Sequence, residues 1–360
     1  MSSTKRQEYR RKNLIYGAIL LLLMGGVYVY RNYLTPNTPP TEQQENQNTV
    51  RFSGKTMGTV PYNVTYIDPQ RRNFKAQFDS LLRQFNQSLS TYIPDSEISR
   101  FNNQKDTLYF DLPYFRPVLQ ASREVWQATK GAFDPTVLPL VNAWGFGPDK
   151  KKSPSEAELD SIRELVNFPA VQFDEEKVWK TDSRIQLDFS AIAKGQAVDV
   201  LGRFLEAQKI ENYLVEVGGE VRCRGRNGSN EVWTIGIEDP VKVSEGKIVP
   251  LARVKLQNRS MATSGNYRNF YVKDGKRYVH TISPQTGNPI EHRLLSVSVL
   301  APTCMKADAY ATAFMVLGRE KAQEIVAADP DLEAFFIYDE EGELATAQSA
   351  GMEKIAEPIQ

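Results

Sequence analysis

The sequence predicts a single large α+β domain, with mixed sheets and packed helices, that follows one transmembrane helix. Three observations predict it. Apolar residues recur at helical spacing in the first half of the chain, β-branched and aromatic residues alternate in much of the second half, and a long uncharged run stands near the N-terminus. At 360 residues with 41% hydrophobic side chains, the chain is long enough to bury a substantial core.

The N-terminal segment has the pattern of an uncleaved signal anchor. Residues 1–13 are basic, and the uncharged run at 14–30 just spans a bilayer core at about 1.5 Å per residue. This charge distribution predicts a cytoplasmic tail and an exported remainder. A cleaved signal peptide is the alternative, although no clean cleavage site follows the run and no cysteine is placed for a lipid anchor. Residues 31–49 are typical of a flexible linker, and the globular domain covers 50–360.

Charge and cysteine content exclude several classes of function. The chain has 44 basic and 44 acidic residues, a balance that argues against a nucleic-acid-binding surface. With only two cysteines and two histidines, Cys/His metal chemistry has no support, and the sequence leaves open whether Cys223 and Cys304 pair. The Walker loop, GxGxxG, HExxH and GxSxG signatures are absent.

The order of helices and strands follows from the apolar pattern. Helices are predicted at about 72–89, 114–129, 191–209, 307–318 and 319–328. A further helix follows Ser153, because Pro154 and Glu156 complete a capping-box pattern with it. Between the third and fourth helices the chain is rich in strand patterns bounded by turns, and a hairpin is predicted at 334–346. These elements fit one unit of sheets and helices.

The segment ADAYATAFMVLG at 307–318 is apolar around much of its circumference, as expected of a buried helix. Asp308 is expensive to bury there unless something compensates its charge. Thr312 lies four positions later and therefore shares the same helix face. Two hard oxygen ligands side by side suit a small divalent cation. The residues leave open the alternative that Asp308 caps the helix N-terminus.

Further polar and aromatic residues stand at junctions between predicted elements. Phe133 and Asp134 open an aromatic, glycine-rich segment that suits either a wall beside a flat ligand or a core patch. Asp188 and Lys194 stand between a strand end and a helix start, a favourable place for phosphates and cations, although Lys194 can equally face solvent. His280 is suited to proton transfer near neutral pH, with a structural histidine as the alternative.

Long motifs follow one another along the chain. They are MGT at 57, STYIPDSEISRFN at 90, GAFDPTVLPLVNAWGFG at 131, LDFSAIAKGQAVD at 187, VEVGGEV at 215, ATSGNYR at 262, HTISPQTGNP at 280 and ADAYATAFMVLG at 307. In this order they resemble the ApbE-type FAD:protein FMN transferase family over about 50–345. The resemblance implies an enzyme that transfers FMN from FAD to a threonine or serine hydroxyl of client redox proteins and releases AMP. It also implies a place on the periplasmic side of the bacterial inner membrane, which agrees with the predicted anchor.

The resemblance also implies roles for individual residues. Asp308 and Thr312, with the backbone carbonyl of Ala191, match the Mg²⁺ ligands of the family, and His280 matches its catalytic histidine. Contacts to the flavin nucleotide are implied for Met57, Tyr92, Ala132, Phe133, Asp134, Asp188, Lys194, Thr281 and Ile282. Mg²⁺ would neutralise the pyrophosphate of FAD, and His280 would take the proton of the attacking hydroxyl or orient it. Clients of the family carry an Asp-Gly-x-Thr/Ser-type motif.

The chain departs from the family pattern at two points. Many relatives have Asp where this chain has Ser283, and many are lipoproteins with a cysteine after the signal, where this chain has an apolar run. Loss of the carboxylate could weaken the orientation of His280 or a polar contact to the nucleotide. Two alternatives stay open: a Mg²⁺-dependent FAD pyrophosphatase, with water in place of the client hydroxyl, and an exported flavin-binding protein without turnover.

Overall fold

The computed structural model describes residues 48–103, 107–147, 154–267, 270–273 and 276–359. These residues belong to one compact unit, which covers 46–360. The predicted tail at 1–13, the predicted membrane helix at 14–30 and nearly all of the linker lie outside the described residues. Within the described ranges, no helix combines the length and the apolar character needed to cross a membrane.

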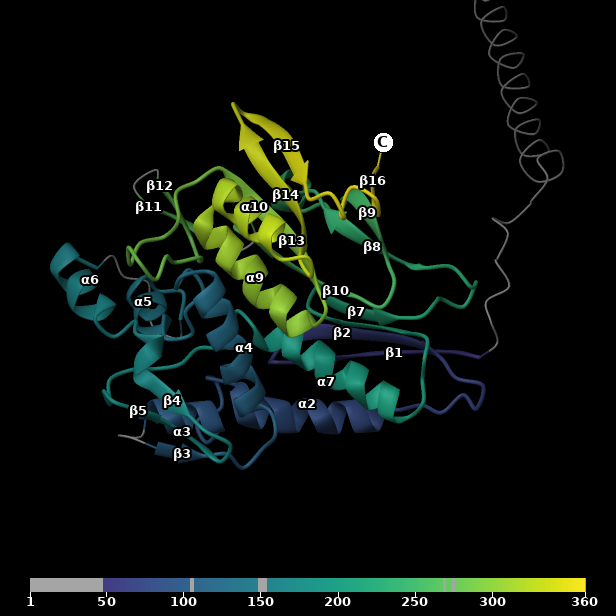
Figure 1. Ribbon diagram of the computed structural model, residues 1–360, viewed down its shortest axis with the longest axis horizontal. Helices are drawn as coiled ribbons and strands as arrows, with labels where there is room; N and C mark the ends of the chain where they lie inside the picture. The colour runs from purple at the N-terminus through teal and green to yellow at the C-terminus, as the bar shows by residue number, and fades with distance from the viewer. Residues whose placement is uncertain (1–47, 104–106, 148–153, 268–269, 274–275, 360) are drawn as a thin grey trace, which may run out of the picture. The chain divides into compact units, whose positions relative to one another are not determined.

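An eight-stranded sheet forms the centre of the fold, with the strand order β1-β2-β6-β7-β10-β13-β14-β15 (Figure 1). In that order the strands are Thr49–Thr56, Val60–Ile67, Tyr213–Val217, Glu220–Arg224, Ser260–Gly265, Leu294–Ala301, Glu333–Glu340 and Glu343–Gln348. The α+β class is confirmed, but every pairing among these described strands is antiparallel, so this sheet is not mixed. Several neighbours, such as β6 and β7, are joined by short turns, which require antiparallel pairing.

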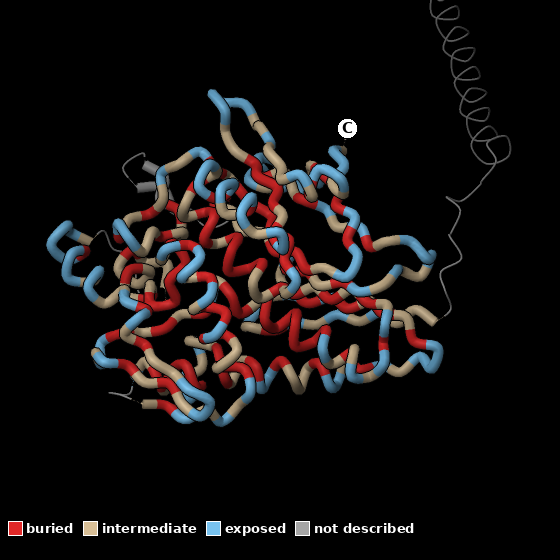
Figure 2. Tube along the Cα trace, viewed as in Figure 1, coloured by how far each residue is buried: buried red, intermediate tan, exposed pale blue. Residues whose placement is uncertain are grey.

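A layer of helices packs with the central sheet and forms the main core with it. Its members are α2 (Lys75–Leu89), α4 (Phe115–Ala128), α7 (Ala193–Ala207), α9 (Cys304–Leu317) and α10 (Arg319–Ala328). α7 packs on β6 and β7, and α9 packs on β10, on β13 and against α7. Alternate strand residues such as Val215 and Val297 join Ala311 and Phe314 of α9 in one apolar cluster. Figure 2 shows the buried residues concentrated between these helices and the sheet.

A smaller sheet covers the opposite face of the central sheet. Its strands, in the order β16-β9-β8, are Ala356–Pro358, Pro250–Leu256 and Trp233–Glu238, and the short helix α8 (Pro240–Ser244) lies between β8 and β9 in the chain. Met261 and Phe335 of the central sheet belong to the apolar cluster of this smaller sheet, whereas their neighbours Ala262 and Phe336 belong to the main core. The sheet is therefore buried on both faces where β10 and β14 lie.

The two cysteines are buried free thiols. Cys223 belongs to the cluster under the smaller sheet, and Cys304 belongs to the main core. They therefore lie on opposite faces of the central sheet and do not form a disulfide with each other.

Peripheral elements complete the described part. They are α3 (Glu97–Asn103), α5 (Leu138–Ala143), α6 (Glu156–Arg163), the 3₁₀ turn at Phe168–Ala170, the sheet β3-β5-β4 (Thr107–Tyr109, Lys177–Lys180 and Val171–Phe173), and the hairpin of β11 (Phe270–Lys273) and β12 (Lys276–Val279). A capping box exists at the start of α6, where Ser155 and Glu158 form it. The predicted N-cap, Ser153, lies outside the described residues. The Ser-x-x-Glu pattern occurs at both places, and the pattern alone does not choose between them.

Most predicted elements are confirmed with small shifts at their ends. α10 has the predicted range, and β14 and β15 form the predicted hairpin. α9 begins at Cys304 rather than at 307, and Thr303 caps it by accepting from Lys306 N at 3.3 Å. Asp308 therefore lies beyond the first turn of the helix.

Candidate active site

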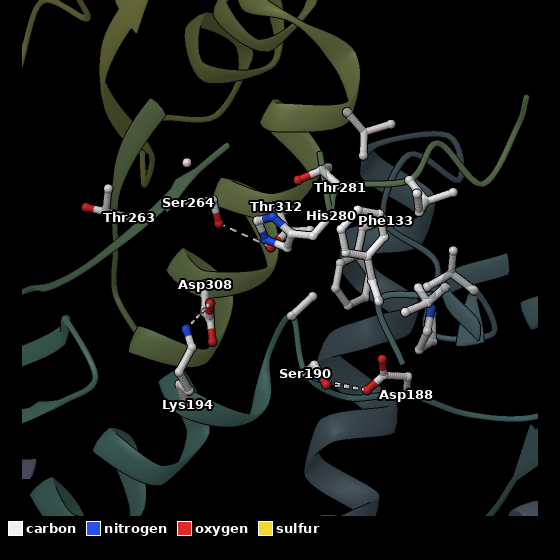
Figure 3. A pocket seen from close by; sticks show the side chains of 18 of the residues that line it. Phe133, Asp188, Ser190, Lys194, Thr263, Ser264, His280, Thr281, Asp308 and Thr312 are labelled. Atoms are coloured by element: carbon white, nitrogen blue, oxygen red, sulfur yellow. Dashed lines mark hydrogen bonds and ion pairs between the residues drawn. The ribbon is translucent and has the colours of Figure 1, made fainter. Parts of the chain in front are cut away.

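All of the predicted site residues except Met57 line one cavity of about 550 Å³ (Figure 3). This volume is within the usual range for small-molecule and cofactor sites. The lining includes Tyr92, Ala132, Phe133, Asp134, Asp188, Ala191, Lys194, His280, Thr281, Ile282, Asp308 and Thr312. Met57, in the turn between β1 and β2, lies outside this described lining, so its flavin contact stays a prediction. Segments far apart in the sequence therefore meet at one place.

One side of the cavity is built from α7, α9 and β7, and we call Lys194, Glu220, Asp308 and Thr312 its helix wall. Asp308 is only 2% exposed. Its Oδ2 accepts a hydrogen bond from Gly195 N of α7 at 2.9 Å, and its Oδ1 lies 3.5 Å from Lys194 Nζ. The alternative that Asp308 caps its own helix is therefore wrong, because it instead satisfies an N–H group in the first turn of α7.

Thr312 lies one turn after Asp308, and its hydroxyl is 3.2 Å from the hydroxyl of Ser264 on β10 (Figure 3). These oxygens and Ala191 line the cavity together. No group of three or more His, Cys, Asp and Glu among the described residues could hold a metal ion. An oxygen-only set with one carboxylate fits Mg²⁺, which is often bound by one or two carboxylates with phosphates and water completing its coordination.

Glu220 also belongs to the helix wall, although the sequence motifs did not single it out. Its Oε1 accepts a hydrogen bond from Lys194, so that Lys194 stands between two buried carboxylates. Its Oε2 is buried and has no hydrogen-bond partner within the part of the chain that is described. Burial favours the neutral amine of Lys194, but Asp308 and Glu220 outweigh burial and raise the pKa of this group. Burial, with help from Asp308, raises the pKa of Glu220 to about 7 against the opposing effect of Lys194.

The signal that could have found Glu220 is the pair of glycines before it. Gly218 and Gly219 have φ angles of +59° and +100°, which favour glycine, and a Cβ on Gly218 would meet Val60 Cγ1 at 2.7 Å. Glu220 is the first residue of the strand that follows this forced turn. A carboxylate at a buried position beside a glycine turn is rare enough to indicate a site.

The other side of the cavity is built from loops, and we call Phe133, Asp134, Asp188 and His280 its loop wall. The Asp134 carboxylate serves its own loop. Its Oδ1 accepts from Thr136 N at 2.8 Å and from Thr136 Oγ1 at 2.5 Å, and its Oδ2 accepts from Trp126 Nε1 at 3.0 Å. Burial raises the pKa of Asp134 in spite of these bonds. Asp134 therefore fixes the loop that brings Phe133 to the cavity.

Asp188 is held in a similar way. Its Oδ1 accepts from Ser190 N at 2.8 Å and from Ser190 Oγ at 2.5 Å, as Figure 3 shows for the two side chains. Its own N–H donates to Pro135 O at 2.7 Å, which joins the loop at 188–190 to the loop that carries Phe133. Burial raises the pKa of Asp188.

The aromatic segment contributes both a wall and a core patch. Phe133 is 3% exposed, belongs to the main core and also lines the cavity. Phe146 lines the cavity too, with its ring centroid 6.4 Å from that of His280. Trp144 instead belongs to a separate apolar cluster, and its Nε1 donates to Gly287 O at 2.7 Å. Tyr92 lines the cavity from an exposed position.

His280 follows β12 and lines the cavity, and Figure 3 shows its ring and the Thr312 side chain in the same space. The other histidine has a structural place. His292 Nε2 lies 2.6 Å from Met315 O at the end of α9, and its Nδ1 accepts from Leu294 N at 3.3 Å. Both ring nitrogens of His292 are therefore engaged by the backbone, as expected of a structural histidine.

Ser283 is the position at which the family resemblance predicts Asp instead. Its hydroxyl accepts from Thr286 N at 3.3 Å, and its own N–H donates to Asn288 O at 2.9 Å. A serine here fixes its own turn, a role that aspartate side chains also perform. Ser283 therefore stabilises the turn next to His280 in a way that aspartate could also supply.

Comparison with known proteins gives a consistent picture. The ApbE family profile matches residues 57–336. The FAD:protein FMN transferase of Haemophilus influenzae is 38% identical over 327 residues, which is 87% of this chain and 93% of that protein. The enzyme of the same name from Escherichia coli K12 is 38% identical and covers 76% of this chain and 80% of its own length. The solved structure of the flavin transferase ApbE from Vibrio cholerae has a TM-score of 0.77 and 35% identity, over 85% of this chain and 99% of that one.

Proposed function

The chain belongs to the ApbE family, and from this premise we propose that it is an FAD:protein FMN transferase. In the proposed reaction a threonine or serine hydroxyl of a client protein attacks the phosphorus of the FMN half of FAD. A P–O bond forms to the client oxygen, the pyrophosphate P–O bond breaks, AMP leaves with the bonding electron pair, and the hydroxyl proton passes to a base. The observation that carries the proposal is the single cavity where Lys194, Asp308 and Thr312 meet Phe133 and His280.

The helix wall would bind the pyrophosphate. Asp308, Thr312 and the Ala191 carbonyl would hold Mg²⁺, which when bound neutralises phosphate charge and stabilises the charge that develops in the reaction. Lys194 supplies a second positive charge in the cavity, since the two carboxylates beside it keep it protonated. Glu220 orients this ammonium group through its hydrogen bond.

The loop wall would bind the flavin and receive the proton. Phe133 and Phe146 offer aromatic surface against which a flat ring system can pack. His280 would accept the hydroxyl proton at an imidazole nitrogen, or orient the hydroxyl, as the client oxygen attacks. An imidazole suits this step because its ordinary pKa lies near neutral pH.

We further propose that the clients carry an Asp-Gly-x-Thr/Ser-type motif and that the enzyme works on the periplasmic side of the bacterial inner membrane. The family resemblance supports the client motif. The basic residues in 1–13 and the uncharged run at 14–30 support the topology, with the catalytic domain tethered by the linker at 31–49.

The test uses the full-length protein in detergent with FAD, MgCl₂ and a client domain that carries the motif. The client mass and the released nucleotides are measured together. The wild type is expected to add one FMN moiety to each client and to release one AMP for each transfer. Asp308→Ala and His280→Ala are expected to lose most of this activity. Asp160→Ala is the matched control, because Asp160 makes only a surface ion pair, with Arg163, in the described part of the chain.

Two outcomes would contradict the proposal in different ways. AMP and FMN in solution without any gain in client mass would identify the FAD pyrophosphatase. FAD that stays bound with neither product formed would identify a flavin-binding protein without turnover.

A further inference from the structure

Asp199 of α7 is fully buried, at 0% exposed, and lies outside the lining of the cavity. Its Oδ1 accepts from Cys304 N at 3.1 Å, and its Oδ2 accepts from Met305 N at 2.9 Å. These are the first two N–H groups of α9. Arg222 of β7 donates to the same carboxylate from Nη1 at 2.7 Å, so the buried negative charge has a cationic partner.

The first three N–H groups of α9 have side-chain acceptors, and Asp199 accepts from two of the three. The fourth, Ala307 N–H, makes the first regular bond of the helix. Cys304 N and Met305 N donate to Asp199, as given above. Lys306 N donates to Thr303 Oγ1 at 3.3 Å, and Ala307 N donates to Thr303 O at 3.1 Å. The first N–H groups of a helix lack acceptors within the helix. A carboxylate from a different helix therefore completes the start of α9.

The arrangement is reciprocal between α7 and α9. α7 carries a donor at Gly195 and a carboxylate four positions later at Asp199, and α9 carries a donor at Cys304 and a carboxylate four positions later at Asp308. Residues four apart share a helix face. A Cβ on Gly195 would lie 2.3 Å from Cys304 O, so the helices cross in backbone contact. We call these contacts the helix clasp.

We propose that Asp199 and Arg222 are positioning residues for the cation site. They hold the start of α9 against α7, and the same helix carries Asp308 and Thr312 into the cavity. The inference rests on the proposed function, because it takes Asp308 and Thr312 as Mg²⁺ ligands. Mutation of residues that orient metal ligands without touching the metal commonly lowers the metal affinity by about 10–100-fold.

The experiment compares Asp199→Ala and Asp199→Asn with Glu206→Gln in the full-length protein. Glu206 is the matched control, because its Oε1 accepts from Arg222 Nη2 at 2.9 Å and from Tyr213 OH at 2.6 Å. Glu206→Gln therefore changes the same Arg222 network but leaves the bonds from Cys304 N and Met305 N to Asp199 in place. FAD binding, followed by flavin fluorescence, is titrated with Mg²⁺. The Mg²⁺ concentration that gives half of the change in flavin fluorescence is expected to rise by about tenfold or more in Asp199→Ala. It should rise less in Asp199→Asn, which keeps one acceptor oxygen, and stay unchanged in Glu206→Gln.

A second readout needs no metal and no turnover. Amide hydrogen exchange of the metal-free protein should accelerate at Cys304 and Met305 in both Asp199 variants and not in the control.

A third readout is the AMP release rate. At saturating Mg²⁺ this rate should recover toward the wild-type value, because the variants impair cation binding rather than the reacting groups. If Asp199→Ala does not fold, Asp199→Asn carries the same test with smaller expected changes.

The outcomes separate this inference from the proposed function. Faster exchange at the start of α9 with an unchanged Mg²⁺ requirement would overturn the positioning role and leave the clasp as a structural feature. Unchanged exchange would overturn the clasp itself. A wild-type protein whose FAD binding and AMP release ignore Mg²⁺ would instead overturn the proposed metal chemistry.

Discussion

The carboxylate side chains of the helix wall and of the loop wall are held in place by contacts of very different range. On the helix wall, Asp308 accepts from Gly195, which is 113 positions away in the sequence. On the loop wall, Asp134 accepts from Thr136 and Asp188 accepts from Ser190, each two positions away. The first kind of contact exists only when the fold is complete, and the second can form within the loop itself.

This difference predicts how each wall responds to mutation. A change on the helix wall should alter stability and cation binding together, because the same buried groups join two helices and line the cavity. A change at a reacting group of the loop wall should alter the reaction with little loss of stability.

The largest effect is expected for Asp308. Asp308→Ala should lower FMN transfer by about 100-fold or more and the free energy of unfolding by about 1–3 kcal/mol, since it removes a proposed ligand and leaves the Gly195 N–H without its acceptor. Asp308→Asn keeps an acceptor oxygen and should recover stability without recovering transfer. Urea denaturation and initial rates measure the two effects. An Asn variant with full activity would rule out a charged ligand at this position.

The two histidines should give opposite results. His280→Ala should lower the transfer rate by about 10²–10⁴-fold, the usual contribution of a general base, and should change the melting temperature less than His292→Ala does. His292→Ala should lower the melting temperature, because its ring bonds the backbone at Met315 and Leu294, and should spare most of the transfer rate. Calorimetry and rate measurements on both variants check this. Equal loss of stability in the two would mean that His280 is structural as well.

Gly195→Ala tests the close crossing of α7 and α9. Its Cβ would lie 2.3 Å from Cys304 O, so the helices must separate, at about 1–3 kcal/mol of stability. Gly202→Ala in the same helix is the control, because its nearest neighbour is the flexible Arg222 side chain, at 2.9 Å. Urea midpoints should show the larger loss at Gly195. A Gly195 variant as stable as the wild type would disprove the backbone contact.

Glu220 should make stability depend on pH. Its folded-state pKa, about 7, is above the ordinary 4.5, so the folded protein keeps a proton that the unfolded chain releases. Wild-type stability should therefore fall as the pH rises from about 4.5 to about 7, and Glu220→Gln should not share this loss. The melting temperature of the variant relative to the wild type should increase across this window.

Glu206 should make stability depend on pH in the opposite direction. Burial opposes ionisation of Glu206, but its bond from Tyr213 and its pairing with Arg222 lower its pKa. That carboxylate therefore stabilises the protein at neutral pH and loses its effect as the pH falls. The deficit of Glu206→Gln should shrink in acid. Parallel pH profiles for the two variants would contradict the assigned shifts.

The smallest effect is expected at Ser283. Ser283→Asp should keep both stability and transfer, because aspartate can also accept the Thr286 N–H group. Ser283→Ala should cost about 0.5–1.5 kcal/mol through the lost hydrogen bond. Thermal melts and transfer rates measure both. A large gain in transfer rate with Ser283→Asp would show that the carboxylate has a role beyond the turn.

The contrast between the walls also explains how far the sequence could predict the site. The spacing of Asp308 and Thr312 indicated that they share a helix face, and the motifs indicated the residues of the loop wall, because both depend on neighbours in the chain. The partners of Asp308 could not be predicted in this way. Gly195 and Asp199 meet α9 only because the central sheet places α7 beside it, and strand order is not a local property.

The sequence did not indicate Glu220 as a site residue, and the prediction of mixed sheets was wrong. Both errors have the same physical cause. Alternation indicates that a segment is a strand, but it does not say which strands pair or in which direction. Glu220 becomes a site residue through Lys194, which is 26 positions away on a helix. α9 begins at Cys304, before the predicted start at 307, because Thr303 and Asp199 together accept from N–H groups that lie before the apolar segment.

The central claim is that both walls serve one reaction, with the cation on the helix wall and the flavin on the loop wall. The most direct test is a crystal structure of the protein with FAD and Mn²⁺, whose anomalous signal locates the metal. The account predicts a cation bound directly to the Asp308 and Thr312 oxygens, with the flavin ring against Phe133. A cation bound away from Asp308, or a flavin outside the cavity, would contradict it.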